Sequence, residues 1–232
     1  MKLNTNSNSY TIIYASVLVV IVAFALAFVS SSLKDTQAKN EDFDKMKQIL
    51  SAINIDASQA ADVQVEFDKY IKADEIMNSK AEVVKTEGGF LIDMKAELAK
   101  DLTDRSLPVY IAEVNGETKY ILPLFGAGLW NSIWGYIALN EDKNTVYGVF
   151  FDHAGETPGL GAEIVTDHFQ NQFKEKHIYS NNKVALSVVK NGKVKNTEFE
   201  VDGLSGGTIT SNGVDAMLKN CISQYDEFLN KQ

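Results

Sequence analysis

The chain has 232 residues, of which 45% are hydrophobic and 23% charged, and it carries a net charge of −9 at pH 7. This composition is ordinary for a globular protein and excludes wholesale disorder. The acidic balance, without a stripe of Lys and Arg, excludes nucleic-acid binding by counterion release. The single cysteine, Cys221, excludes an internal disulfide and a metal centre built from cysteines.

Residues 12–29 form an apolar run that only Ser16 interrupts. A helix over this run is about 27 Å long at 1.5 Å per residue, and its neighbours extend it to the roughly 30 Å of a bilayer's hydrocarbon core. A secretory signal peptide is the alternative, but its apolar core is usually shorter, roughly 7–15 residues, and is preceded by more positive charge. We therefore predict a short N-terminal segment, residues 1–11, and a transmembrane anchor over residues 12–33.

Lysines flank the predicted anchor on both sides, with Lys2 before it and Lys34 and Lys39 after it. The count of positive charges therefore does not decide which side of the membrane the rest of the chain faces. Residues 34–40 are polar and predict a linker. Because the whole chain has only three prolines, the remainder, residues 41–232, is predicted to be one domain.

Hydrophobic residues recur at helical spacing in two segments near the start of this domain. The first, residues 41–55, predicts an amphipathic helix whose inward face consists of Phe43, Met46, Ile49, Leu50 and Ile53. The second, residues 60–77, predicts a helix with one apolar face made of Val63, Phe67, Tyr70 and Ile71.

The middle of the chain is predicted to form β-strands. Three segments each predict a hairpin: residues 107–125 around Asn115-Gly116, residues 133–152 around the polar turn 141–144, and residues 183–201 around Asn191-Gly192.

Two further helices complete the pattern. One covers roughly residues 162–176 with Ile164, Val165, Phe169 and Phe173 facing inward, and the last begins near Ser211. The last helix has a buried stripe of Val214, Met217, Leu218, Cys221, Tyr225, Phe228 and Leu229. Strands in hairpins with helices among them predict an α+β fold with a largely antiparallel sheet flanked by helices.

Two glycine-containing loops in this region have the composition of ligand-binding loops. The first, GAGLW at residues 126–130, is no dinucleotide fingerprint, since Asn131 stands where GxGxxG needs glycine. It is either a turn leading into a buried aromatic or a loop beside a flat ligand, with Leu129 and Trp130 against it. In the second, DHAGETPGLGAE at residues 152–163, Gly159 and Gly161 allow the backbone to approach a ligand closely.

No catalytic or metal site is predicted. Asp152, His153 and Glu156 are candidate metal ligands, but no residue nearby supplies the rest of a coordination shell. Ser205 in GLSGG matches the bare string of a hydrolase nucleophile elbow. That mechanism needs a histidine later in the chain, and none follows Ser205.

The loop SGGTITS, residues 205–211, leads directly into the last predicted helix. One interpretation is a phosphate site, because the free N–H groups and the positive end of a helix attract anions. The other is purely structural, with Thr210 or Ser211 as the helix N-cap and the glycines turning the chain. The residues alone leave both open.

A longer stretch, DGLSGGTITS at residues 202–211, resembles the flavinylation motif of the FMN-binding domain family, Asp-Gly-x-Ser-Gly-Ala-Thr-x-Thr-Ser. The one departure is Gly207, where alanine is commoner. The resemblance implies FMN bound covalently, through a phosphoester, to Thr208, and Thr210 is the nearest alternative.

Two other segments strengthen the resemblance. ETPGLGAEI, residues 156–164, resembles a second flavin-contacting segment of that family. GAGLWNSIWGYIAL, residues 126–139, resembles the C subunits of sodium-translocating NADH:quinone oxidoreductases, and its GLW favours them over the related G subunits of Rnf ferredoxin:NAD oxidoreductases. The implied cofactor-binding residues are Thr208, Ser205, Gly206, Gly207, Ile209, Thr210, Glu156, Thr157, Gly159, Leu160, Leu129 and Trp130.

The resemblance also implies a setting. The domain is expected on the periplasmic side of a bacterial inner membrane, anchored in the lipid bilayer, with FMN attached by a flavin transferase. It is expected to relay electrons among the other subunits of a complex that moves sodium, and to bind neither NADH nor quinone itself. A G subunit of an Rnf complex is the first alternative, and a membrane-anchored binding or assembly module without cofactor is the second.

Overall fold

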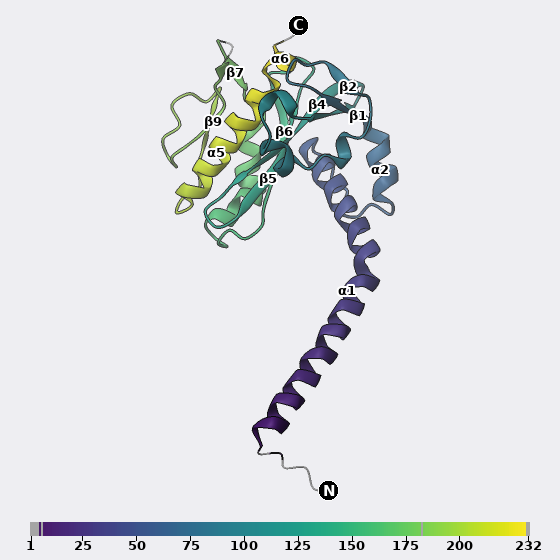
Figure 1. Ribbon diagram of the computed structural model, residues 1–232. Coiled ribbons are helices and arrows are strands. Elements are labelled where there is room, and N and C mark those ends of the chain that lie inside the picture. The colour runs from purple at the N-terminus through teal and green to yellow at the C-terminus, as the bar shows by residue number, and fades with distance from the viewer. Residues whose placement is uncertain (1–4, 6, 182, 231–232) are drawn as a thin grey trace. The chain divides into compact units, whose positions relative to one another are not determined.

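The computed structural model describes residue 5 and residues 7–181 and 183–230 (Figure 1). The chain divides into two compact units, Met1–Lys45 and Met46–Gln232. Lys2 and part of the predicted N-terminal segment, residues 1–11, lie outside the described residues.

A single helix, α1 (Asn8–Ala52), contains the predicted anchor. It is long and apolar enough to cross a membrane, and its most apolar window is not buried in the protein. Residues 34–40, expected as a linker, are helical and continue α1 without a break into the predicted helix 41–55. The physical reason is that α1 contains neither glycine nor proline, so no residue in it interrupts helical hydrogen bonding.

The last turns of α1, from Met46 onward, belong to the second unit and to its core. Ile49 and Leu50 are fully buried, as predicted, whereas Phe43 is half-exposed. Trp134 donates an indole hydrogen bond to Gln48 at 3.2 Å, which fastens this part of α1 to the sheet.

The predicted helix over residues 60–77 is only half correct. Helix α2 (Val63–Tyr70) is capped by the Asp62 carboxylate, which accepts from the amides of Gln64 and Val65. At Ile71 the chain becomes strand β1 (Ile71–Met77), which pairs antiparallel with β3 (Leu107–Val114). Pairing with β3 overrides the helical spacing of the apolar residues.

The central sheet has the order β2-β1-β3-β4-β5-β6, with every described pair of neighbours antiparallel. The other strands are β2 (Val83–Lys85), β4 (Glu117–Ala127), β5 (Ser132–Leu139) and β6 (Val146–His153). The first two predicted hairpins are confirmed, and the turn between β3 and β4 has both Asn115 and Gly116 at positive φ. The α+β prediction is confirmed.

The third predicted hairpin is wrong. Strands β9 (Ser187–Val189) and β10 (Glu200–Asp202) pair in parallel, and β7 (Tyr179–Ser180) pairs with β8 (Lys183–Val184). A turn does form at Asn191-Gly192, since the Lys193 amide donates to the Lys190 carbonyl. After this turn the chain does not pair directly with β9. It first pairs at Glu200, where β10 lies parallel to β9.

The helix expected over residues 162–176 is broken into η3 (Gly161–Val165), α4 (Asp167–Gln170) and η4 (Asn171–Phe173). The break occurs at Thr166, which has an extended backbone and caps α4 through its hydroxyl. Ile164, Phe169 and Phe173 are fully buried as predicted, but Val165 is 44% exposed.

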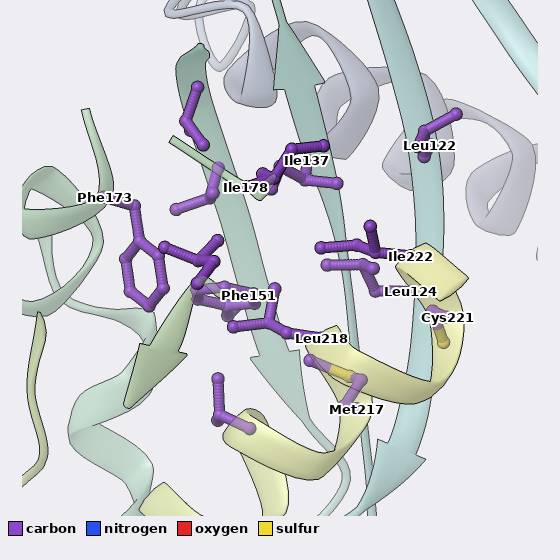
Figure 2. Close-up of a cluster of buried hydrophobic side chains, with 14 of the residues drawn as sticks. Leu122, Leu124, Ile137, Phe151, Phe173, Ile178, Met217, Leu218, Cys221 and Ile222 are labelled. Atoms are coloured by element: carbon purple, nitrogen blue, oxygen red, sulfur yellow. The ribbon is translucent and has the colours of Figure 1, made fainter. Parts of the chain in front are cut away.

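The last long helix, α5 (Thr208–Ile222), begins three residues before the predicted Ser211. Its buried stripe is confirmed and continues through η5 (Ser223–Tyr225) and α6 (Asp226–Leu229), with only Phe228 partly buried. Figure 2 shows Leu218 and Ile222 of α5 in one cluster with Leu124 of β4 and Phe151 of β6. The short segments η1 (Gly89–Leu91), α3 (Met94–Leu98) and η2 (Leu102–Asp104) connect β2 to β3.

The sheet is covered on both faces, because neighbouring residues of a strand point to opposite sides. Leu122 and Leu124 of β4 pack in the cluster that includes α5, while Ile121 packs with Leu50 and the end of α1. The start of α5 lies beside the loops that follow β4 and β6, since residues of all three line one cavity.

Candidate functional site

A cavity of about 250 Å³ lies where three distant segments of the chain meet. One segment is the loop between β4 and β5, the second follows β6, and the third is the start of α5. Its lining residues are Leu129, Glu156, Thr157, Leu160, Gly161, Gly206, Gly207, Thr208, Ile209 and Thr210.

The structure thus brings together nine of the twelve residues that the sequence predicted for cofactor binding. Ser205, Gly159 and Trp130 do not line the cavity, although Trp130 donates its indole N–H to the Thr157 hydroxyl at 3.2 Å. Gly161, which lines it, was noted for its close approach but not counted among the binding residues. The binding roles themselves remain predictions.

Glu156 occupies the junction of the three segments and is only 4% exposed. One carboxylate oxygen accepts from the Trp130 amide at 2.9 Å, and the other accepts from the Thr210 hydroxyl at 2.5 Å. Burial raises the pKa of this carboxyl, but the hydrogen bonds from Thr210 and from the amides of residues 129–131 outweigh burial and hold the pKa below its ordinary value.

Two glycines allow the backbone to lie close to this carboxylate, because neither carries a Cβ atom. A Cβ atom on Gly128 would lie 2.5 Å from Glu156 Oε1, and one on Gly161 would lie 2.3 Å from Thr210 Oγ1. Any larger residue at either position would push the loops away from Glu156. In this structure Gly161 makes space for protein groups, a role that the sequence did not reveal.

The N-terminus of α5 is not capped as expected. Thr210 and Ser211 lie inside the helix, and Ser211 donates to the Gly207 carbonyl at 2.9 Å and accepts from the Leu204 amide at 2.8 Å. The N-cap is Gly207, and no side chain among the described residues caps α5. The first N–H groups and the positive end of the helix dipole therefore remain available to an anion.

The two candidate threonines differ sharply in accessibility. Thr208, the first residue of α5, is exposed at the cavity, whereas Thr210 is 1% exposed. The Thr210 hydroxyl is also engaged in a hydrogen bond, because it donates to the Glu156 carboxylate. Only the Thr208 hydroxyl combines solvent access with a position at the helix start.

An apolar rim surrounds the cavity. It consists of four exposed side chains: Leu129 (46%), Trp130 (70%), Leu160 (42%) and Ile209 (57%). The reading of GAGLW as a turn into a buried aromatic is therefore wrong, because Trp130 faces solvent. A rim of this kind suits the flat, largely apolar face of an aromatic ligand.

The loop after β6 uses its other polar groups internally. The Glu156 amide donates to His153 Nδ1 at 3.2 Å, and the Asp152 carboxylate accepts from the His153 amide at 2.8 Å. Within the part of the chain that the structure describes, no group of three or more His, Cys, Asp or Glu side chains is arranged to hold a metal ion.

Comparisons with known proteins agree on one family. The FMN-binding domain model matches residues 128–223, which include all three segments of the cavity. The C subunit of the Na(+)-translocating NADH-quinone reductase of Haemophilus ducreyi is 32% identical, over 94% of this chain and 91% of that protein. The corresponding subunit of Pseudomonas aeruginosa is 30% identical, over 97% and 96%.

Solved structures give the same result. The crystal structure of the C subunit of the Na(+)-translocating NADH-quinone reductase from Parabacteroides distasonis has a TM-score of 0.80 and 43% identity, covering 86% of this chain and 98% of that one. NqrC of Shewanella oneidensis has a TM-score of 0.70 and 25% identity, covering 82% and 97%.

Proposed function

Because this chain belongs to the NqrC family, the C subunits of the Na(+)-translocating NADH-quinone reductases, we propose that it carries electrons within such a reductase through an FMN attached to Thr208. One observation carries the assignment of the residue. Thr208 presents an exposed hydroxyl at the uncapped start of α5, on the wall of the cavity.

The residues present fit the phosphate of FMN. Gly206 has φ = 75°, a conformation that glycine adopts without strain, and it turns the chain into the start of α5. The amides of residues 208–210, which open α5 without a side-chain cap, form together with the helix dipole a positive site for an anion. A phosphoester on Thr208 places its negative charge there.

The residues also fit a flat ring. Leu129, Leu160 and Ile209 line the cavity and keep apolar surface exposed at its mouth. Bound FMN supplies the electron-transfer chemistry, and this chain excludes water from one side of the ring, orients it and sets its polarity. A covalent bond keeps the cofactor in place whether it is oxidised or reduced.

The attachment is a phosphoryl transfer onto the protein. The Thr208 oxygen attacks the flavin-side phosphorus of FAD, the bond from that phosphorus to the bridging oxygen breaks, and AMP leaves. A base of the flavin transferase takes the hydroxyl proton. Thr210 is a poor acceptor, because its hydroxyl is buried and already donates to Glu156.

The proposal extends to the setting of the domain. The apolar part of α1, residues 12–33, serves as the anchor in the lipid bilayer of a bacterial inner membrane. The resemblance supports a periplasmic location for the domain, residues 41–232, and contact with the other subunits of the reductase, which supply and remove the electrons. The chain has no NADH site of its own in this proposal.

Denaturing gel electrophoresis tests the assignment. The full chain is expressed with a flavin transferase, and the gel is examined under ultraviolet light. We expect a yellow-green fluorescent band for the wild type and no band for Thr208→Ala. The matched control is Thr103→Ala, which removes an exposed threonine of η2 and keeps the band. A fluorescent band in Thr208→Ala would move the attachment elsewhere, and none in the wild type would exclude a covalent flavin.

A further inference from the structure

We propose that Glu156 is a positioning residue that latches two walls of the cavity together rather than a group that touches the flavin. This inference rests on the flavin function proposed above. One wall is the loop around Leu129 and Trp130, and the other is the first turn of α5. The latch is the pair of hydrogen bonds from the Trp130 amide and the Thr210 hydroxyl to the two oxygens of one carboxylate.

The carboxylate has little capacity left for a ligand. Each of its two oxygens already accepts one hydrogen bond, Oε1 from the Trp130 amide and Oε2 from the Thr210 hydroxyl. Glu156 is only 4% exposed, so little of its surface is left for contact with a ligand. On the sides of Gly128 and Gly161 the protein already lies close against it, since a single carbon added to either glycine would lie within 2.6 Å of its oxygens.

The latch joins three segments that are distant from one another in the sequence. Thr210 and Glu156 are 54 residues apart, and Trp130 comes from a third segment. The loop after β6 is closed by its own hydrogen bonds, for example from the Leu160 and Ala162 amides to the Thr157 carbonyl. Glu156 therefore connects a rigid loop to both the Trp130 loop and the helix start, and sets the separation of the cavity walls.

The test uses the full chain without flavin first. Hydrogen exchange is measured in Glu156→Ala and Thr210→Val at two amides: that of Trp130, which donates to Glu156, and that of Ser211, which donates to the Gly207 carbonyl in the first turn of α5. Losing a hydrogen bond to a charged group should raise the open population, and so the exchange rate there, about tenfold or more. The matched control is Tyr225→Phe, which removes a buried hydrogen bond to the Pro108 carbonyl and should leave those amides unchanged.

Rescue and coupling separate a latch from general destabilisation. Glu156→Gln should restore most of the protection, because its amide group can accept from Trp130 and donate to the Thr210 oxygen. Glu156→Ala with Thr210→Val should exchange no faster than the faster single variant, since both break one connection. Unchanged exchange in Glu156→Ala, or additive effects in the double variant, would overturn the latch.

The flavin-loaded chain then tests the consequence. Glu156→Ala and Thr210→Val should keep the covalent band in the gel, while iodide quenches their native flavin fluorescence several-fold more strongly than in the wild type. Quenching equal to that of the wild type would mean that Glu156 does not position the flavin. If the wild type showed no fluorescent band, the proposed flavin function would be wrong, but the hydrogen-exchange result on the flavin-free chain would still hold. Failure of the function and failure of the latch are therefore distinguishable.

Discussion

Leu50→Ala tests whether the last turns of α1 are part of the core of the domain. Leu50 is fully buried and packs in the cluster that contains Ile121 and Tyr136 of the sheet. The substitution removes three carbon atoms, and at about 0.8 kcal/mol per buried CH2 the lost transfer free energy is roughly 2.4 kcal/mol. The cavity left behind raises the loss in unfolding free energy to about 3–5 kcal/mol.

The assay is thermal unfolding of the detergent-solubilised full chain, followed by circular dichroism. In a domain of this size a loss of about 3 kcal/mol lowers Tm by roughly 6–12 °C. Leu91→Ala is the matched control, because Leu91 is 82% exposed and its truncation should change the unfolding free energy by less than about 0.5 kcal/mol. Equal Tm values for the two variants would refute the packing of α1 into the domain.

Three further predictions concern the site and the core. Gly161→Ala should cost about 1–3 kcal/mol, because its Cβ would lie 2.3 Å from Thr210 Oγ1, whereas Gly155→Ala meets no atom within 4 Å and should melt like the wild type. The pKa of Glu156 in the folded protein lies below its ordinary value of 4.5. The ionised carboxylate therefore contributes its full stability above about pH 4.5, and this contribution is lost as the pH falls through the folded-state pKa. In urea titrations the wild type should therefore lose more stability than Glu156→Gln on acidification below about pH 4.5, and equal losses would contradict the pKa shift. Burial raises the pKa of Cys221 to about 11, so at pH 8 only about one thiol in a thousand is ionised, and a thiol reagent such as DTNB should react after unfolding but not before. Fast labelling of the native protein would show that Cys221 is accessible.

Short sequence motifs predicted correctly the turns whose conformation depends on their own residues. Asn115-Gly116 specifies a two-residue turn, and the strands on either side of it pair as the sequence indicates. At Asn191-Gly192 only the glycine has positive φ, so the turn there is not the two-residue hairpin turn, and no hairpin follows. The strands around it pair in parallel instead, because pairing also depends on which segment the rest of the fold places alongside.

The same limit explains the error at Ile71. Apolar residues at helical spacing run through residues 60–77, and helix propensity alone gives no reason to stop at Tyr70. The chain changes to β1 there because β3 lies alongside, and six of the seven residues of β1 have a partner on β3 that helps to satisfy their backbone groups.

For the site, sequence patterns identified the three segments but not their internal connections. The bond between Glu156 and Thr210 spans 54 residues and depends on the arrangement of the sheet beneath them. Gly161 is needed because an added Cβ would lie 2.3 Å from Thr210 Oγ1 and 2.6 Å from Glu156 Oε2, which no pattern in the loop itself indicates.

The register of α5 decides which hydroxyl is accessible. Consecutive helical residues are about 100° apart, so residues two positions apart point in nearly opposite directions. With the helix starting at Thr208, Thr210 faces inward to Glu156 and Thr208 faces outward to solvent. A start at Ser211, as the sequence predicted, would instead leave both threonines in the preceding loop with no such distinction. In this register the Thr210 bond to Glu156 belongs to the buried face of α5, and Thr208 lies on the exposed face, where the proposed reaction can reach it.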